Sequence, residues 1–110
     1  MTWKTIAAGT TIGGEGSENG TILQDEEFRD RARITLEKDG KSAPFAITCG
    51  IYGWMFHTRF FSSLPETTVE YERMKAALSD LLASSADRPS TVAESADFLE
   101  AIKEFVRRFP

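Results

Sequence analysis

The stretch from Arg31 to Phe61, RARITLEKDGKSAPFAITCGIYGWMFHTRFF, decides the fold of this chain. Its first part, residues 32–36, alternates apolar with polar residues, which is the pattern of a half-buried strand. Asp39-Gly40 follows and favours a two-residue hairpin turn. That turn pairs Ile34 with Phe45 on the neighbouring strand, so apolar side chains meet on one face of the sheet.

A second chain reversal is needed further along this stretch, because a single strand of a small domain does not run from Phe45 to Phe61. Gly50 or Gly53 marks the turn, and we expect it to be a two-residue turn. The residues that then share the predicted core face are Phe45, Ile47, Cys49, Trp54, Phe56, Thr58 and Phe60. The residues predicted on the opposite, open face are Arg33, Thr35, Thr48, Met55, His57, Arg59 and Phe61.

Two helices are predicted after these strands. Ser63 and Thr91 each precede a glutamate by three residues, the spacing of a capping box, with Ser90 as an alternative second cap. Apolar residues then recur at helical spacing, so we expect one helix over residues 64–83 and a second from residue 91 onwards. Strands followed by helices, without β-α-β alternation, indicate an α+β fold. We expect an antiparallel β-meander of four to five strands, followed by two C-terminal amphipathic helices packed on one sheet face.

The rest of the chain is read as connections and one weak strand. A short strand is predicted within the first nine residues. Residues 12–20 contain the run GGEGSENG and are predicted to form a flexible loop that is too polar to bury anything. A strand then begins at Thr21, and the acidic residues 25–27 are expected in a solvated turn. Residues 84–90 are expected to link the helices, and residues 1–110 to form one domain.

Composition excludes several classes of partner. The net charge is −4 over 110 residues, so the basic surface needed to bind nucleic acid is missing. The apolar stretch before Phe61 is broken by glycine, histidine and arginine, which argues against a membrane span. Cys49 is the only cysteine and the N-terminus lacks the apolar segment of a signal peptide, so we expect a cytoplasmic protein.

Catalytic and metal sites are not predicted. Cys49 and His57 are the only residues of their kinds, but two-residue turns send them to opposite faces, and only an odd-length loop would bring them together. One histidine and one cysteine do not make a zinc site. We therefore expect no metal, no cofactor and no catalytic residue.

Function is predicted from the open face. His57 and Arg59 project the same way there and form the most suggestive pair, able to hold an anion or a carboxylate. The ligand or interface candidates are His57, Arg59, Thr48, Met55, Arg33 and Tyr52. The first hypothesis is a small protein-interaction module, a homodimer that binds a protein partner through the open sheet face or the terminal helix. The alternative is a small-molecule or anion-binding protein, or a small enzyme, with a pocket around His57 and Arg59.

Overall fold

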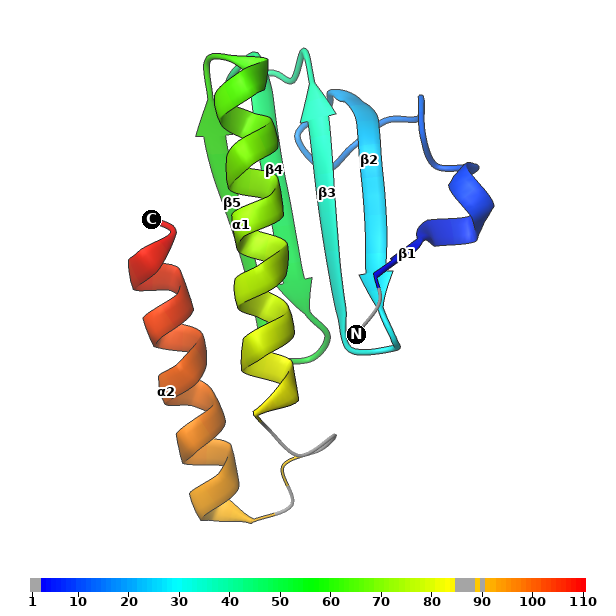
Figure 1. Ribbon diagram of the computed structural model, residues 1–110. Helices are drawn as coiled ribbons and strands as arrows, with labels where there is room; N and C mark the ends of the chain where they lie inside the picture. The colour runs from blue at the N-terminus through cyan, green and yellow to red at the C-terminus, as the bar shows by residue number, and fades with distance from the viewer. Residues whose placement is uncertain (1–2, 85–88, 90) are drawn as a thin grey trace.

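The computed structural model describes residues 3–84, 89 and 91–110. A five-stranded antiparallel sheet has its strands in chain order and carries two helices on one face (Figure 1). The predicted α+β meander with two C-terminal helices is therefore confirmed. The elements are β1 (Lys4–Thr5), η1 (Ile6–Gly9), β2 (Thr21–Phe28), β3 (Ala32–Lys38), β4 (Phe45–Ile51), β5 (Met55–Phe61), α1 (Leu64–Ala83) and α2 (Val92–Arg108).

Both helices begin where the capping residues predict. Ser63 Oγ accepts a hydrogen bond from the Glu66 backbone N–H at 3.4 Å, and Thr91 Oγ1 accepts one from the Glu94 N–H at 3.1 Å. Each bond satisfies a backbone donor that the first helical turn leaves free. The predicted linker 84–90 falls largely outside the described residues, so that prediction remains untested.

The core lies between the sheet and α1. One stripe of α1 buries Tyr71, Met74 and Leu78 completely against the strands, and Phe98 and Phe105 of α2 close the same cluster. The buried strand residues of this cluster are Phe28, Ala32, Ile34, Leu36, Ile47, Cys49, Ile51 and Phe61.

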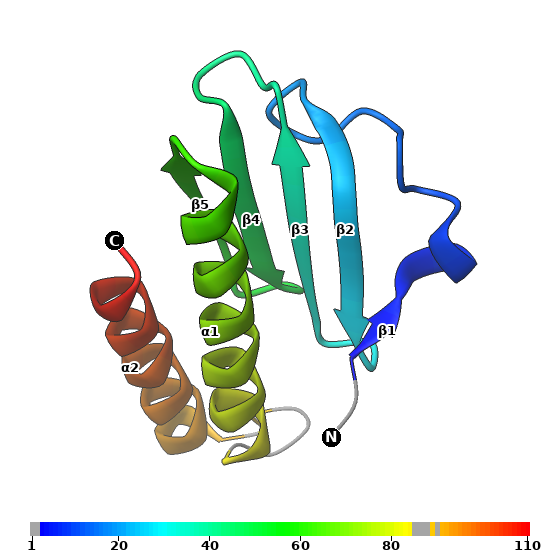
Figure 2. The ribbon, with the colours of Figure 1, turned by 45° about the horizontal axis from the view of Figure 1, so that its top comes forward.

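The helical layer is displaced toward one edge of the sheet. Helix α1 packs on β3, β4 and β5, whereas α2 lies beside α1 and projects past β5, as Figures 1 and 2 both show. On the opposite side, neither of these two helices covers β2 in either view. At the β5 edge, the helical layer therefore extends beyond the sheet.

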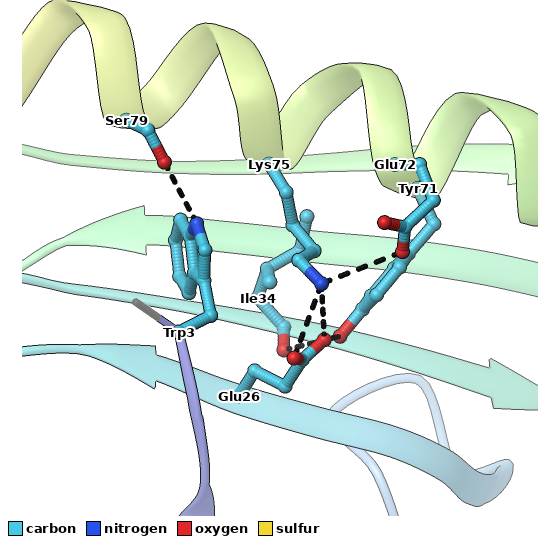
Figure 3. A network of polar contacts seen from close by, with 7 residues as sticks. All are labelled: Trp3, Glu26, Ile34, Tyr71, Glu72, Lys75 and Ser79. Carbon is cyan, nitrogen blue, oxygen red and sulfur yellow. Dashed lines mark hydrogen bonds and ion pairs between the residues drawn. The ribbon is translucent and has the colours of Figure 1, made fainter. Parts of the chain in front are cut away.

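A polar network replaces apolar packing where α1 meets β2. Figure 3 shows Tyr71 and Lys75 converging on the carboxylate of Glu26: the tyrosine hydroxyl donates at 2.7 Å and the ammonium lies 3.0 Å away. Nearby, the Trp3 indole N–H donates to Ser79 Oγ at 2.8 Å. These contacts hold the N-terminal segment and β2 against α1, although no helix lies over β2.

The β3–β4 connection is longer than predicted. Lys38 pairs with Phe45, so the loop spans residues 39–44 and the predicted two-residue turn is wrong. The loop reaches the 13–20 segment, where the Lys41 N–H donates to the Glu18 carbonyl at 3.0 Å. Because the predicted and the observed loop both have an even number of residues, Ile34 still shares a face with Phe45, and the predicted core face of β3 and β4 is correct.

The β4–β5 turn overturns the predicted faces of β5. Ile51 pairs with Met55, which leaves a three-residue turn over residues 52–54 where two residues were predicted. Gly53 takes a φ of +81° in this turn, and the Trp54 N–H donates to the Ile51 carbonyl at 2.9 Å. The extra residue exchanges the side chains on the two faces of β5. Met55, His57, Arg59 and Phe61 therefore share the helix-covered face, while Phe56, Thr58 and Phe60 lie on the open face.

The 13–20 segment folds over the open face. Glu37 is fully buried there, and its Oε1 accepts hydrogen bonds from the backbone N–H groups of Gly20 at 2.9 Å and Glu18 at 3.1 Å. A Cβ on Gly16 would lie 2.6 Å from this carboxylate, so the close approach requires glycine. The prediction that this segment buries nothing is wrong, because it buries a carboxylate.

Replacing Glu37 with alanine tests this contact. The Glu37→Ala substitution removes the acceptor for two backbone donors, and we expect a loss of about 1–3 kcal/mol in the free energy of unfolding. Urea denaturation measures the loss. The matched control is Glu104→Ala, whose exposed carboxylate pairs with Arg107 on the surface of α2 and should cost less than about 0.5 kcal/mol. Equal losses in the two variants would show that the 13–20 segment is not held by Glu37.

Candidate functional site

A groove of about 670 Å³ runs along the open face of the sheet. Its lining includes residues 15–17 and the β4–β5 turn at residues 52–54. Gly50 forms part of the floor; a Cβ there would meet the Met55 carbonyl oxygen at 3.3 Å and the Phe56 ring at 3.7 Å. The further side chains that line it include Ile22, Arg33, Thr35, Thr48, Tyr52 and Phe56.

An ion pair joins the buried Asp25 to Arg33, a partly exposed residue of the groove lining. Asp25 sits opposite Thr35 on β3 and accepts from Arg33 Nε at 2.9 Å, from Arg33 Nη2 at 2.6 Å and from Thr35 Oγ1 at 2.9 Å. Burial alone would raise the pKa of Asp25, but hydrogen bonds to its carboxylate, first of all the one from Arg33, outweigh burial and hold that pKa below its usual value. The arginine fork is therefore committed to Asp25 and does not stand free for a ligand carboxylate.

Hydroxyl groups line the remaining polar part of the groove. Thr48 Oγ1 lies 3.3 Å from Ser17 Oγ and 3.1 Å from Thr58 Oγ1. The Tyr52 hydroxyl donates to Glu27 Oε2 at 2.8 Å. Burial and this bond raise the pKa of Tyr52 to about 12, so the phenol remains a hydrogen-bond donor at neutral pH.

An aromatic patch adjoins the groove on β5, and we define it as Phe56 and Phe60. Phe56 is 87% exposed and Phe60 is 48% exposed. Their partners on β4 are the small residues Gly50 and Ala46, so their cross-strand neighbours on β4 are too small to cover the two rings. Large exposed aromatic side chains on the flat face of a sheet are typical of contact surfaces.

His57 and Arg59 lie on the other face and hold the end of α2. His57 Nε2 contacts the Phe109 carbonyl oxygen, and Arg59 Nε donates to the Pro110 carbonyl at 3.2 Å. Arg59 Nη1 also pairs with Glu70 at 2.8 Å, and its hydrogen bond is the main reason why the pKa of Glu70 lies below its usual value. The predicted placement of this pair on the open face is wrong, and both side chains bind the chain itself.

Cys49 and His57 are cross-strand partners, the arrangement that only an odd-length turn allows. The cysteine is nevertheless 1% exposed, and burial raises the pKa of Cys49 to about 12. A nucleophilic cysteine needs a thiolate near neutral pH and access to substrate, so this pair does not provide a catalytic site.

The groove brings together some of the predicted candidates and separates others. Arg33, Thr48, Tyr52 and Met55 all line it, although the register places Met55 on the helix-covered face. Sequence reasoning missed Asp25, which was expected in a solvated turn and is instead buried in β2. It also missed Phe56 and Phe60, which it assigned to the core.

Among residues 3–84, 89 and 91–110, no group of three or more His, Cys, Asp or Glu side chains is arranged to hold a metal ion. In the same part of the chain, no helix is long and apolar enough to cross a membrane. The polar groups of the groove are hydroxyls, the Glu15 carboxylate and Arg33, which Asp25 neutralises, and its apolar groups include aromatic rings.

The buried Asp25 predicts a specific acid sensitivity. An unfolded aspartate titrates near pH 3.9 and the folded group has a lower pKa, so its stabilisation is complete above the unfolded pKa and is lost as pH falls through the folded pKa. We expect the free energy of unfolding of Asp25→Asn to depend less on pH between about 5 and 3 than that of the native chain. Denaturant titrations at several pH values measure this. The control, exposed Asp80→Asn, should keep the native slope.

The buried Cys49 predicts low thiol reactivity. At about pH 8, below the usual thiol pKa, the folded protein should react with dithionitrobenzoate far more slowly than the same protein in guanidinium chloride. The reason is that the folded thiol is both protonated and inaccessible. Absorbance of the released thionitrobenzoate follows the reaction. Equal rates in the folded and unfolded protein would contradict the assigned burial.

Comparison with known proteins gives no family for this chain. No protein-family model matches it. No curated protein and no solved structure matches it either. Its function therefore has to be inferred from its own surfaces.

Proposed function

We propose that this chain is a small protein-interaction module that forms a homodimer through the open face of its sheet. The observation that carries the proposal is the exposure of Phe56, whose ring stands 87% open to solvent on a β-strand. Phe60 adds a second ring on the same face of that strand. Burial of a phenylalanine side chain is worth about 1.5–3 kcal/mol, so covering both rings supplies a substantial part of a dimer's stability.

The electrostatics of the surface support a protein contact. Asp25 neutralises Arg33 and Glu27 binds the Tyr52 hydroxyl, so these charges next to the aromatic patch are already paired within the chain. Interface cores are depleted of free charge and enriched in aromatic residues. The small size and overall negative charge of the chain also favour a partner protein over nucleic acid.

We place the protein in a reducing compartment, the cytoplasm, on the basis of its single buried cysteine.

A small-molecule site is the second candidate, and the groove itself favours it. Its volume of about 670 Å³ lies in the range of about 300–1,000 Å³ typical of ligand pockets. The alternative pocket is thus moved from His57 and Arg59 to the walls formed by Thr48, Tyr52 and Phe56. The hydroxyl groups and aromatic ring suit a neutral, partly aromatic ligand better than an anion, because the Arg33 fork is occupied.

The homodimer is tested by mass in solution. Sedimentation equilibrium of the native chain should give twice the chain mass at micromolar concentration, and Phe56→Ser should shift the mass to that of the monomer. Losing two ring contacts per dimer weakens association by about 3–6 kcal/mol in total, enough for a visible shift.

The matched control for this test is Val69→Ser on α1. Val69 is 59% exposed but lies away from the open face, so its replacement should leave the mass unchanged. A native chain that stays monomeric throughout the accessible concentration range would contradict the proposed dimer. A mass shift in the Val69 variant would move the contact surface to the helices.

A further inference from the structure

Resting on the groove as a ligand site, the second function proposed above, we infer the class of ligand that it takes: a planar aromatic ring that carries a neutral amide. The ring lies above Gly50, against the side chain of Phe56. The amide carbonyl accepts a hydrogen bond from Arg33, and the amide N–H groups donate to oxygen atoms of the lining. Arg33 is thereby the residue that selects the ligand.

The register of the sheet leaves a gap for the ring in the middle of the groove. Gly50 pairs with Arg33 on β3 and with Phe56 on β5, so two large side chains flank a position that has none. Strands β3 and β5 are two strand spacings apart, about 9–10 Å. The Phe56 ring borders the gap, because a Cβ on Gly50 would lie 3.7 Å from it. A flat ring placed above Gly50 therefore meets an aromatic surface on the β5 side.

The Arg33 guanidinium has one amino group left for a ligand. Its Nε and Nη2 atoms donate to Asp25 at 2.9 and 2.6 Å. Among residues 3–84, 89 and 91–110, Asp25 is the sole hydrogen-bond partner of this side chain, so Nη1 is free to donate. The Arg33 side chain is 43% exposed and lines the groove. An oxygen atom of a ligand in the groove can therefore reach this donor.

The charges around this donor select a neutral acceptor over an anion. Asp25 already cancels the charge of Arg33, and the Glu15 carboxylate adds a negative charge to the lining. Glu27 adds another, because it is the cross-strand partner of Arg33 on β2. A ligand carboxylate would meet an excess of negative charge, and like charges brought together oppose binding. A carbonyl oxygen accepts from Nη1 without this repulsion.

The other polar groups of the lining supply acceptors for a ligand N–H. They include the Glu15 carboxylate and the hydroxyl oxygens of Ser17 and Thr48, which lie 3.3 Å from each other. Carboxylate and hydroxyl oxygens each have more than one lone pair, so they can accept further hydrogen bonds. An amide has a carbonyl acceptor and N–H donors in one plane, and so it suits both kinds of partner. An ester offers only the acceptor.

Probes that share one ring system test the ligand class: naphthamide, naphthoate and methyl naphthoate. On titration with naphthamide, we expect the backbone N–H signals of Thr48 and Gly50 and the Nε–H signal of Arg33 to shift in nitrogen–proton correlation spectra. Naphthoate should bind about tenfold more weakly, because its charge is repelled. Methyl naphthoate should bind about two- to tenfold more weakly, because it lacks the N–H donors.

Substitution of Arg33 tests the assigned donor. Arg33→Lys keeps a positive charge beside Asp25 but removes the Nη1 group, so the affinity for naphthamide should fall about two- to tenfold, the effect of one hydrogen bond. The matched control is Arg107→Lys on the surface of α2, where the side chain is 62% exposed and away from the groove; its affinity should be unchanged. Phe56→Leu is a second variant, which keeps an exposed apolar side chain but removes the ring. It should weaken all probes about two- to tenfold.

The outcomes separate the ligand class from the ligand site itself. Absence of shifts in the groove with every probe overturns the groove as a ligand site and this inference with it. Shifts in the groove with equal affinity for naphthamide and naphthoate overturn the ligand class and leave the groove standing as a ligand site. Unchanged affinity in folded Arg33→Lys, or an equal loss in Arg107→Lys, overturns the role of Arg33. If Arg33→Lys does not fold, unchanged affinity in Phe56→Leu overturns the assigned position of the ring.

Discussion

The three-residue turn between β4 and β5 is the constraint on which the rest of the molecule depends. Because the turn contains an odd number of residues, it decides which set of alternate β5 side chains faces the helices. His57 and Arg59 become internal anchors for the end of α2, and Phe56 and Phe60 become surface. A turn one residue shorter would bury the two rings and expose two polar side chains, and the same sequence would present a different surface chemistry.

The elements were largely predictable from sequence, and their faces only in part. Alternation located β3, and capping residues located both helices, since these signals are local. The β5 faces failed because parity depends on one residue of turn length. The glycine at position 53 is the clue in the sequence. It takes a φ of +81°, which suits the third residue of a type II turn, a position that favours glycine. Asp25 was missed because the acidic run 25–27 was expected in a solvated turn, whereas it continues β2; a bulge at Leu23 also shifts the register of that strand, and the sequence does not reveal it.

Two carboxylates, those of Asp25 and Glu37, are buried on the side of the sheet away from the two helices. Asp25 is neutralised by a side-chain partner, the bidentate Arg33, whereas Glu37 is bound by backbone N–H groups of the 13–20 segment. Buried carboxylates are costly without such partners, so both contacts contribute to the stability of the fold beside the groove. The segment that was predicted to be a flexible loop thus supplies the hydrogen bonds to one of the two buried carboxylates.

The brevity of β1 has a consequence for growth of any assembly. A sheet with two adhesive edges can add chains without end, as fibrils do. Here one edge is only two residues long, and β5 is the sole long edge among the described strands. Growth of the sheet from the β1 side is therefore disfavoured, because so short a strand offers few backbone groups to an added chain.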